Sequence, residues 1–181
     1  MRPKRERATD NRQTYFVTSR TAGSRSLFQS DRWANLFVET LYHYRAEGAY
    51  LLHAFVVMPD HFHAIITPAG ALERAVQFIK GGFSRRAKSE FDYPWDVWQK
   101  GFSDHRIREW ADYQRHVEYI RQNPVRKHLC STPEEYPYGS AYPGFEFDPA
   151  PQGLKPQSLT AHDGAAEAAP FQSKKVAGGR A

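Results

Sequence analysis

The chain has 181 residues, of which 40% are hydrophobic, 14% aromatic and 25% charged, and its mean hydropathy is −0.71. This size allows one compact domain with tails, and no apolar run approaches the roughly 18 residues that a membrane span needs. The basic N-terminus lacks the apolar stretch of a signal peptide, and the single cysteine, Cys130, excludes an internal disulfide. We therefore expect a cytoplasmic protein without a membrane segment.

Charge is distributed unevenly along the chain. Residues 131–181 carry four basic and six acidic side chains, which leaves 21 basic and 14 acidic side chains in residues 1–130. A compact domain with an excess of seven positive charges favours nucleic acid as a partner. Because many soluble domains are mildly basic, charge alone is equally compatible with no such partner.

Alternating and helical patterns predict the first elements. Residues 1–13 are read as a basic flexible arm, and residues 15–19 as a short strand. Apolar residues at helical spacing between Ser30 and Gly48 predict an amphipathic helix. The apolar, β-branched run 49–58 and the segment 61–68 then predict two strands, which the Pro59-Asp60 turn joins into a hairpin.

The second half of the domain is predicted to repeat this plan. A helix follows from about Leu72, with Gly81-Gly82 weakening its middle, then a short strand at 97–102 and a third helix from 106 to 123. The order is that of an α+β, ferredoxin-like (RRM-like) βαββαβ antiparallel sheet with an additional C-terminal helix.

The chain changes character after residue 130, which we take as the end of the domain that begins at residue 14. Seven of the twelve prolines lie in the last 51 residues. Residues 131–150 still hold several aromatics and are expected to extend over the domain, whereas residues 151–181 are expected to be disordered.

Two histidines stand on one face of the second hairpin strand. His61 and His63 flank Phe62, and because side chains alternate along a strand both imidazoles project to the same side. Such a pair can bind one divalent ion. An isolated His-x-His is also common on half-exposed sheets, so the pair by itself favours two surface histidines without a metal.

The third helix directs a tyrosine away from its apolar face. At 100° per residue Tyr119 points well off the stripe, and Asn123 follows one turn later on the same side. A hydroxyl nucleophile and a carbonyl ligand are thus stacked together. Asn123 precedes Pro124, and it is equally suited to cap a following turn. The apolar stripe consists of Tyr113, Val117 and Ile120.

Other chemistry is sparse. Asp104-His105, just before the third helix, offers a further metal ligand or general base, or else a helix-start acid beside a surface histidine. No glycine-rich phosphate loop is present, since Gly81-Gly82 lies in a helical stretch without a Walker pattern.

Three segments together resemble a known family. VVMPDHFHAIITP at 56–68, WQKGFSDHRIR at 98–108 and HVEYIRQNPVRKHL at 116–129 are similar to the single-tyrosine HUH transposases, and more narrowly to the REP-associated tyrosine transposases. The likeness covers roughly residues 10–145. Its specificity comes from the combination of His-hydrophobe-His after a Met-Pro-Asp turn with a later Tyr-Ile-x-x-Asn-Pro helix.

The resemblance implies a site and a reaction. His61 and His63 would hold Mg²⁺ or Mn²⁺, Asn123 would complete the metal site where relatives often carry glutamine, and Tyr119 would be the nucleophile. The expected activity is metal-dependent cleavage and strand transfer of single-stranded DNA beside palindromic, REP-like hairpins through a 5′-phosphotyrosine. Such proteins act as monomers or homodimers.

Basic and aromatic side chains are expected to hold the DNA. Trp95 and Trp98 could stack unpaired bases. Two alternatives remain: a non-catalytic RRM-like nucleic-acid binder, against which the aromatic motifs of that fold are not evident, and a domesticated DNA-binding regulator. The residues expected on the DNA backbone are Arg85, Arg86, Lys88, Arg121, Arg126 and Lys127.

Overall fold

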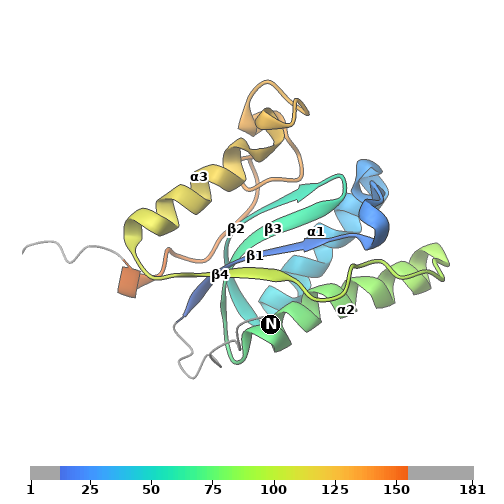
Figure 1. Ribbon diagram of the computed structural model, residues 1–181, viewed down its shortest axis with the longest axis horizontal. Helices are drawn as coiled ribbons and strands as arrows, with labels where there is room; N and C mark the ends of the chain where they lie inside the picture. Colours follow the sequence, from blue (N-terminus) through green and yellow to red (C-terminus); the bar gives the residue numbers. More distant parts are fainter. Residues whose placement is uncertain (1–12, 155–181) are drawn as a thin grey trace, which may run out of the picture.

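A computed structural model describes residues 13–154. Four antiparallel strands form one sheet, with two helices against one face and the third helix against the other (Figure 1). This arrangement confirms the α+β, ferredoxin-like expectation. The elements are β1 (Thr14–Arg20), α1 (Asp31–Ala46), β2 (Tyr50–Met58), β3 (His61–Pro68), α2 (Leu72–Phe91), β4 (Ser103–Ile107) and α3 (Trp110–Arg126).

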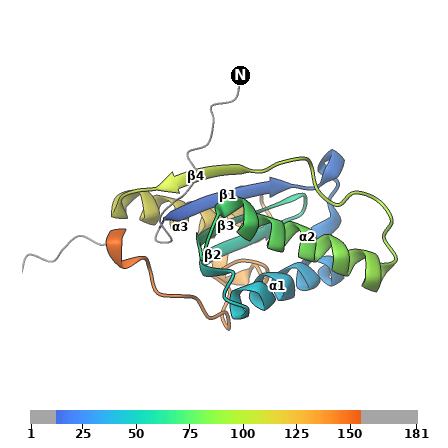
Figure 2. The same cartoon turned by 90° about the horizontal axis from the view of Figure 1, so that it is seen from below.

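The strand order is β2-β3-β1-β4, with every neighbouring pair antiparallel. Figure 2 shows β4 and β1 at one side of the sheet, β3 and β2 at the other, and α1 and α2 side by side along one face. The predicted hairpin is confirmed, because β2 and β3 pair on either side of the Pro59-Asp60 turn. β1 therefore lies in the middle of the sheet, beside β3.

Side-chain alternation along β3 divides the interior into two cores. Phe62, Ala64 and Ile66 pack with α1 and α2, whereas Ile65 packs with residues of α3. His61 and His63 share the parity of Ile65, so both rings are turned to the α3 face of the sheet. The two-residue alternation of side chains along β3 thus places both histidines on the face that α3 covers.

The fourth strand is not where the sequence pattern predicts it. The expected strand at 97–102 and the expected helix start at 106 are both wrong, since β4 is Ser103–Ile107 and α3 begins at Trp110. β4 is a half-exposed edge strand with polar residues, so it carries no apolar alternation. The aromatic stretch before it packs on the core instead, where the Trp98 indole donates to the carbonyl of Lys80 at 3.0 Å.

Helix α3 also runs further than expected. It continues through Asn123 and Pro124 to Arg126, so Asn123 lies inside the helix and does not cap a following turn. Pro124 lies in the last turn, where its missing N–H removes a single helical hydrogen bond. The carbonyls of Asn123 and Pro124 both accept hydrogen bonds at the end of the helix. The backbone N–H of Lys127 donates to Asn123 at 3.1 Å, and that of Leu129 donates to Pro124 at 2.9 Å.

The chain after α3 returns along the free edge of β2 (Figure 1). Val57 donates to the carbonyl of Tyr138, and Ser140 donates to the carbonyl of Phe55, both at 2.8 Å. Further on, Asp148 pairs with Arg45 at 2.8 Å. The two backbone bonds of Val57 and Phe55 satisfy groups that an open edge would leave exposed.

Some expectations concern segments outside the described residues. Residues 1–12, most of the expected basic arm, and residues 155–181 of the expected tail are among them. Residues 151–154 are described and differ from the expected disorder, because Gln152–Leu154 forms a 3-10 turn and Leu154 packs on the α3 core. In the described part of the chain, every helix is too short or too polar to cross a membrane.

The two glycines in the middle of α2 should respond oppositely to alanine. A Cβ at Gly82 would lie 2.2 Å from the ring of Tyr44, which is buried and bonded to Arg85, whereas a Cβ at Gly81 meets nothing within 4 Å. We expect Gly82→Ala to lower the free energy of unfolding by about 1–3 kcal/mol and Gly81→Ala to raise it by about 0.5–1 kcal/mol. Urea denaturation of both variants measures this, and equal effects would contradict the packing described.

Candidate active site

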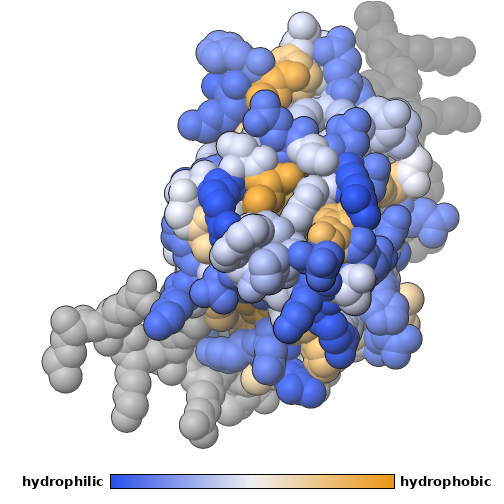
Figure 3. Space-filling view, turned by 90° about the vertical axis from the view of Figure 1, so that its right-hand side faces the viewer, coloured by the Kyte–Doolittle hydropathy of each residue, from blue (hydrophilic) through white to orange (hydrophobic). Residues whose placement is uncertain are grey.

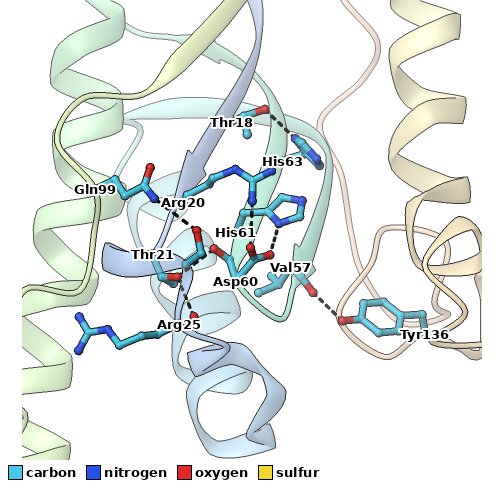
Figure 4. Close-up of polar contacts among 11 residues, drawn as sticks. Thr18, Arg20, Thr21, Arg25, Val57, Asp60, His61, His63, Gln99 and Tyr136 are labelled. Carbon is cyan, nitrogen blue, oxygen red and sulfur yellow. Dashed lines mark hydrogen bonds and ion pairs between the residues drawn. The ribbon is translucent and has the colours of Figure 1, made fainter.

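A cleft of about 400 Å³ lies between the β2–β3 turn and the C-terminal half of α3. It brings together His61, His63, Tyr119, Asn123 and Lys127, which come from two elements far apart in the sequence. The two histidine rings lie on the hairpin, on the side of the sheet that α3 covers (Figure 4).

His61 begins β3 and is held by the residue before it. Its Nδ1 donates to Asp60 Oδ1 at 2.5 Å, and Asp60 also accepts from Arg20 at 2.9 Å (Figure 4). The residue is 7% exposed, and burial lowers the pKa of His61 although Asp60 opposes the shift. With Nδ1 engaged, Nε2 is the nitrogen left for a metal.

His63 is held in the same way from the neighbouring strand. Its Nδ1 lies 2.7 Å from Thr18 Oγ1, and its ring stacks on Phe16. Burial, and then the adjacent His61, lowers the pKa of His63 to about 3. Its Nε2 is buried and has no hydrogen-bond partner among residues 13–154. A neutral imidazole whose buried ring nitrogen has no partner is suited to ligate a metal, so the pair fits a divalent ion.

Tyr119 stands over this pair. Its ring meets that of His63 edge to face at a centroid distance of 5.3 Å. The Arg126 guanidinium lies 5.8 Å from the centroid of the Tyr119 ring. The residue is 38% exposed at the mouth of the cleft. Asn123, one turn later, is buried and lines the same cleft. Tyr119 and the two histidines therefore line the same cleft.

His105 does not join this cleft. It lies on β4 opposite Phe16, and its ring stacks on His116 near the start of α3. The ring of Phe16 contacts both His63 and His116. The sequence offers both Asn123 and His105 as further metal ligands. Of these two, Asn123 shares the cleft with His61 and His105 does not.

The six basic residues expected on DNA do not form one surface. Arg85 and Arg86 lie with Lys88 on α2, which covers the opposite face of the sheet. Arg86 pairs with Glu39 and Glu90, and Arg85 donates to Tyr44. On the α3 side Arg121 pairs with Glu134, whereas Lys127 lines the cleft and Arg126 lies by Tyr119.

The two tryptophans expected to stack bases also differ from each other. Trp98 packs among core aromatics, with the rings of Phe28, Phe62 and Phe83 each 5.6–5.7 Å away. Trp95 is 66% exposed and remains accessible.

The end of the molecule at which β1 finishes and the hairpin turns is mainly hydrophilic, with small, separate hydrophobic areas (Figure 3).

Sequence reasoning missed the residues that orient the histidines. The partners are Thr18, Arg20 and Asp60, and the first two lie on β1, 45 and 40 positions before the hairpin residues that they contact, His63 and Asp60. Asp60 adjoins His61 and could have been found from that position. Thr18 could not, because its place opposite His63 depends on the register between β1 and β3.

Comparison with known proteins identifies the family. The family model described as "Transposase IS200 like" matches residues 11–123, and the chain belongs to this family of transposases, which are DNA-cleaving enzymes. A REP-associated tyrosine transposase from Escherichia coli (strain K12) is 26% identical over 131 residues, which cover 70% of this chain and 75% of the relative. A relative from Haemophilus influenzae is 25% identical over 122 residues, covering 61% of this chain and 67% of the relative.

The fold has a solved counterpart. The structure of the REP-associated tyrosine transposase bound to a REP hairpin superposes with a TM-score of 0.64 at 22% identity, covering 85% of this chain and 94% of that one. The likeness supports the same α+β fold with its four-stranded sheet and three helices.

The buried, neutral His63 should make folding stability depend on pH. Because its pKa is near 3 in the folded chain and about 6.5 in the unfolded chain, the unfolded state binds the extra proton between these values. Stability should therefore fall as the pH drops below about 6.5, and His63→Gln should reduce this slope by up to about 1.4 kcal/mol per pH unit. Urea denaturation between pH 7 and pH 4 measures the slope, and an identical slope in the variant would contradict the burial of a neutral imidazole.

Proposed function

We propose that this transposase cleaves and transfers single-stranded DNA beside a hairpin, with Tyr119 as the nucleophile and His61 and His63 as ligands of Mg²⁺ or Mn²⁺. The proposal is carried by one observation: His63, whose buried Nε2 has no hydrogen-bond partner among residues 13–154, lines one cleft with Tyr119, and the two rings are in contact. A nucleophile and a pair of metal ligands so placed can act on the same phosphate.

The residues of the chain have distinct roles in this reaction. Asp60 and Thr18 hold the two imidazoles with Nδ1 engaged, so that both Nε2 atoms are free to ligate. When bound, the ion polarises the scissile phosphate and offsets the charge that develops on it. Asn123, which lines the cleft beside them, is the further ligand we propose.

The chemical step conserves the energy of the phosphodiester. The hydroxyl of Tyr119 loses its proton and its oxygen attacks phosphorus, while the bond from phosphorus to the 3′ oxygen breaks. The products are a 5′-phosphotyrosine and a DNA end whose 3′ oxygen takes up a proton. A second 3′-hydroxyl can then attack the phosphotyrosine and release Tyr119, which needs no nucleotide cofactor.

The shape of the cleft favours a single strand. The two histidines that share the cleft with Tyr119 are at most 7% exposed, and a stiff duplex would have to bend at a cost of several kcal/mol to bring a phosphate to them. The related transposase whose fold is similar has been solved with a REP hairpin, and we propose a palindromic hairpin with an unpaired flank as the substrate here. Arg126, whose guanidinium lies 5.8 Å from the centre of the Tyr119 ring, and Lys127, which lines the cleft, are the basic residues that we propose to hold its backbone.

The other four basic residues expected on DNA do not line the cleft, so we propose that they contact only DNA that extends beyond it. Arg121, which pairs with Glu134 on the α3 side, would meet DNA that continues along that helix. Arg85, Arg86 and Lys88 would contact only DNA that passes around the sheet to α2. Their loss should weaken binding without removing cleavage.

Replacing the nucleophile should abolish cleavage while keeping the fold. We expect Tyr119→Phe to retain the ring contacts to His63 and Phe16 and to lower cleavage of a hairpin strand by about a thousandfold or more. The matched control is Tyr142→Phe, another exposed tyrosine. Denaturing gels detect the covalent adduct, and gel shifts report binding.

Two outcomes would overturn this assignment. One is cleavage by Tyr119→Phe at a rate comparable with that of Tyr142→Phe. The other is binding of cognate hairpins by the wild-type chain with neither adduct nor cleavage, which would indicate a DNA-binding regulator.

Metal removal should separate cleavage from binding. EDTA should stop cleavage, Mg²⁺ or Mn²⁺ should restore it, and His61→Ala with His63→Ala should prevent the restoration. Hairpin binding should survive, because phosphate contacts come mainly from arginine and lysine. His43→Ala, at an exposed position on α1, is the control, and the circular dichroism melt of each variant checks the fold. Cleavage indifferent to EDTA would contradict the metal role.

A further inference from the structure

A second group of metal-ligand side chains lies where the start of α3 crosses β4. His105 comes from β4, and Asp112 and His116 come from successive turns of α3. One ligand atom from each lies within 4.8 Å of the others. Within residues 13–154, no other three histidine, cysteine, aspartate or glutamate side chains come together in this way.

The distances are close to those of a formed metal site. Asp112 Oδ2 lies 2.7 Å from His105 Nε2, and Asp112 Oδ1 lies 3.2 Å from His116 Nδ1. Ligand atoms about 2.0–2.1 Å from a tetrahedral Zn²⁺ stand about 3.3 Å apart. The His105 and His116 rings are already stacked, with centroids 4.8 Å apart and planes 19° from parallel. An ion therefore needs only small side-chain movements to enter.

This group is separate from the cleft that holds His61. The ring of Phe16 contacts His63 at a centroid distance of 5.1 Å and His116 at 4.7 Å. None of His105, Asp112 and His116 lines the cleft of His61 and Asn123. An ion bound here would thus be a second ion and not a displaced first one.

We propose that His105, Asp112 and His116 form a second site for a divalent transition-metal ion, Zn²⁺ being the best fit, which fastens the start of α3 to β4. Two imidazoles and one carboxylate with a fourth position open to water are a familiar donor set for Zn²⁺. Tyr119 follows His116 by three residues, on the same side of α3. An ion bound here would also steady Tyr119, and this role rests on the proposed function of Tyr119 as the nucleophile. Binding of the ion does not depend on that function.

Two present contacts compete with the ion. Arg115 donates to Asp112 Oδ1 at 3.1 Å, and His116 Nδ1 donates to the backbone carbonyl of Asp112 at 2.9 Å. Arg115 is mostly exposed, so it can leave at little cost. Removing it should strengthen metal binding, which an ion-pair cluster without a metal role would not do.

The test measures Zn²⁺ binding without a purification tag. In the full chain carrying His61→Ala and His63→Ala, competition with a chromophoric chelator should give one Zn²⁺ per chain, and Co²⁺ should show the visible absorption of a tetrahedral site. Adding His105→Gln and Asp112→Asn should weaken binding by more than about tenfold, since even changes beyond the direct ligands cost about 10–100-fold. Adding His43→Ala should change nothing, and adding Arg115→Ala should tighten binding.

Each result decides the proposal. Zn²⁺ should also raise the melting temperature of the chain with His61→Ala and His63→Ala, and not of the one that further carries Asp112→Asn. If the first pair of substitutions prevents folding, the wild-type chain should lose one Zn²⁺ per chain on introduction of His105→Gln with Asp112→Asn. Equal Zn²⁺ affinity with and without these two substitutions would overturn the second site, whatever the outcome of the cleavage assays.

Discussion

The functional arrangement depends on α3 packing against the face of the sheet that α1 and α2 leave free. Ile65 of β3 and Ile120 of α3 belong to the same buried cluster. Because strand side chains alternate, the parity that buries Ile65 under α3 also turns His61 and His63 toward that helix. Because the helix has 3.6 residues per turn, burying Ile120 leaves Tyr119 beside it at the surface. One packing interface thus sets the positions of both histidines and the tyrosine.

Burial is also what prepares the histidines. Removing His63 from water keeps it neutral, and the partner on Nδ1 decides which nitrogen stays available. Asp60 does the same for His61 and is itself held by Arg20. The site is therefore organised by the β1–β3 register and the hairpin turn before any ligand enters, which reduces the reorganisation that binding requires.

Sequence patterns predict the elements that are rich in buried apolar residues and miss those that are not. The hairpin follows from two apolar runs on either side of Pro59-Asp60, and the outward direction of Tyr119 follows from the helical period of 3.6 residues. The edge strand β4 is half exposed and polar apart from Ile107, so its pattern does not mark a strand, and the prediction fell on the aromatic stretch before it. Thr18 could not be placed, because register is a tertiary property. Its positive charge made Arg86 a candidate DNA contact. The sequence does not reveal that α2 lies on the face of the sheet opposite the cleft, or that Arg86 pairs there with Glu39 and Glu90.

The central claim is that one phosphate is reached by Tyr119 and by the two histidines together. The most direct measurement is to trap the covalent complex of the wild-type chain with a hairpin single strand in Mn²⁺, digest it with trypsin and identify the modified peptide by mass spectrometry. We predict a nucleotide joined through its 5′ phosphate to Tyr119, in the peptide HVEYIR that spans residues 116–121. Attachment to any other residue, or a complex that forms equally well in EDTA, would contradict it.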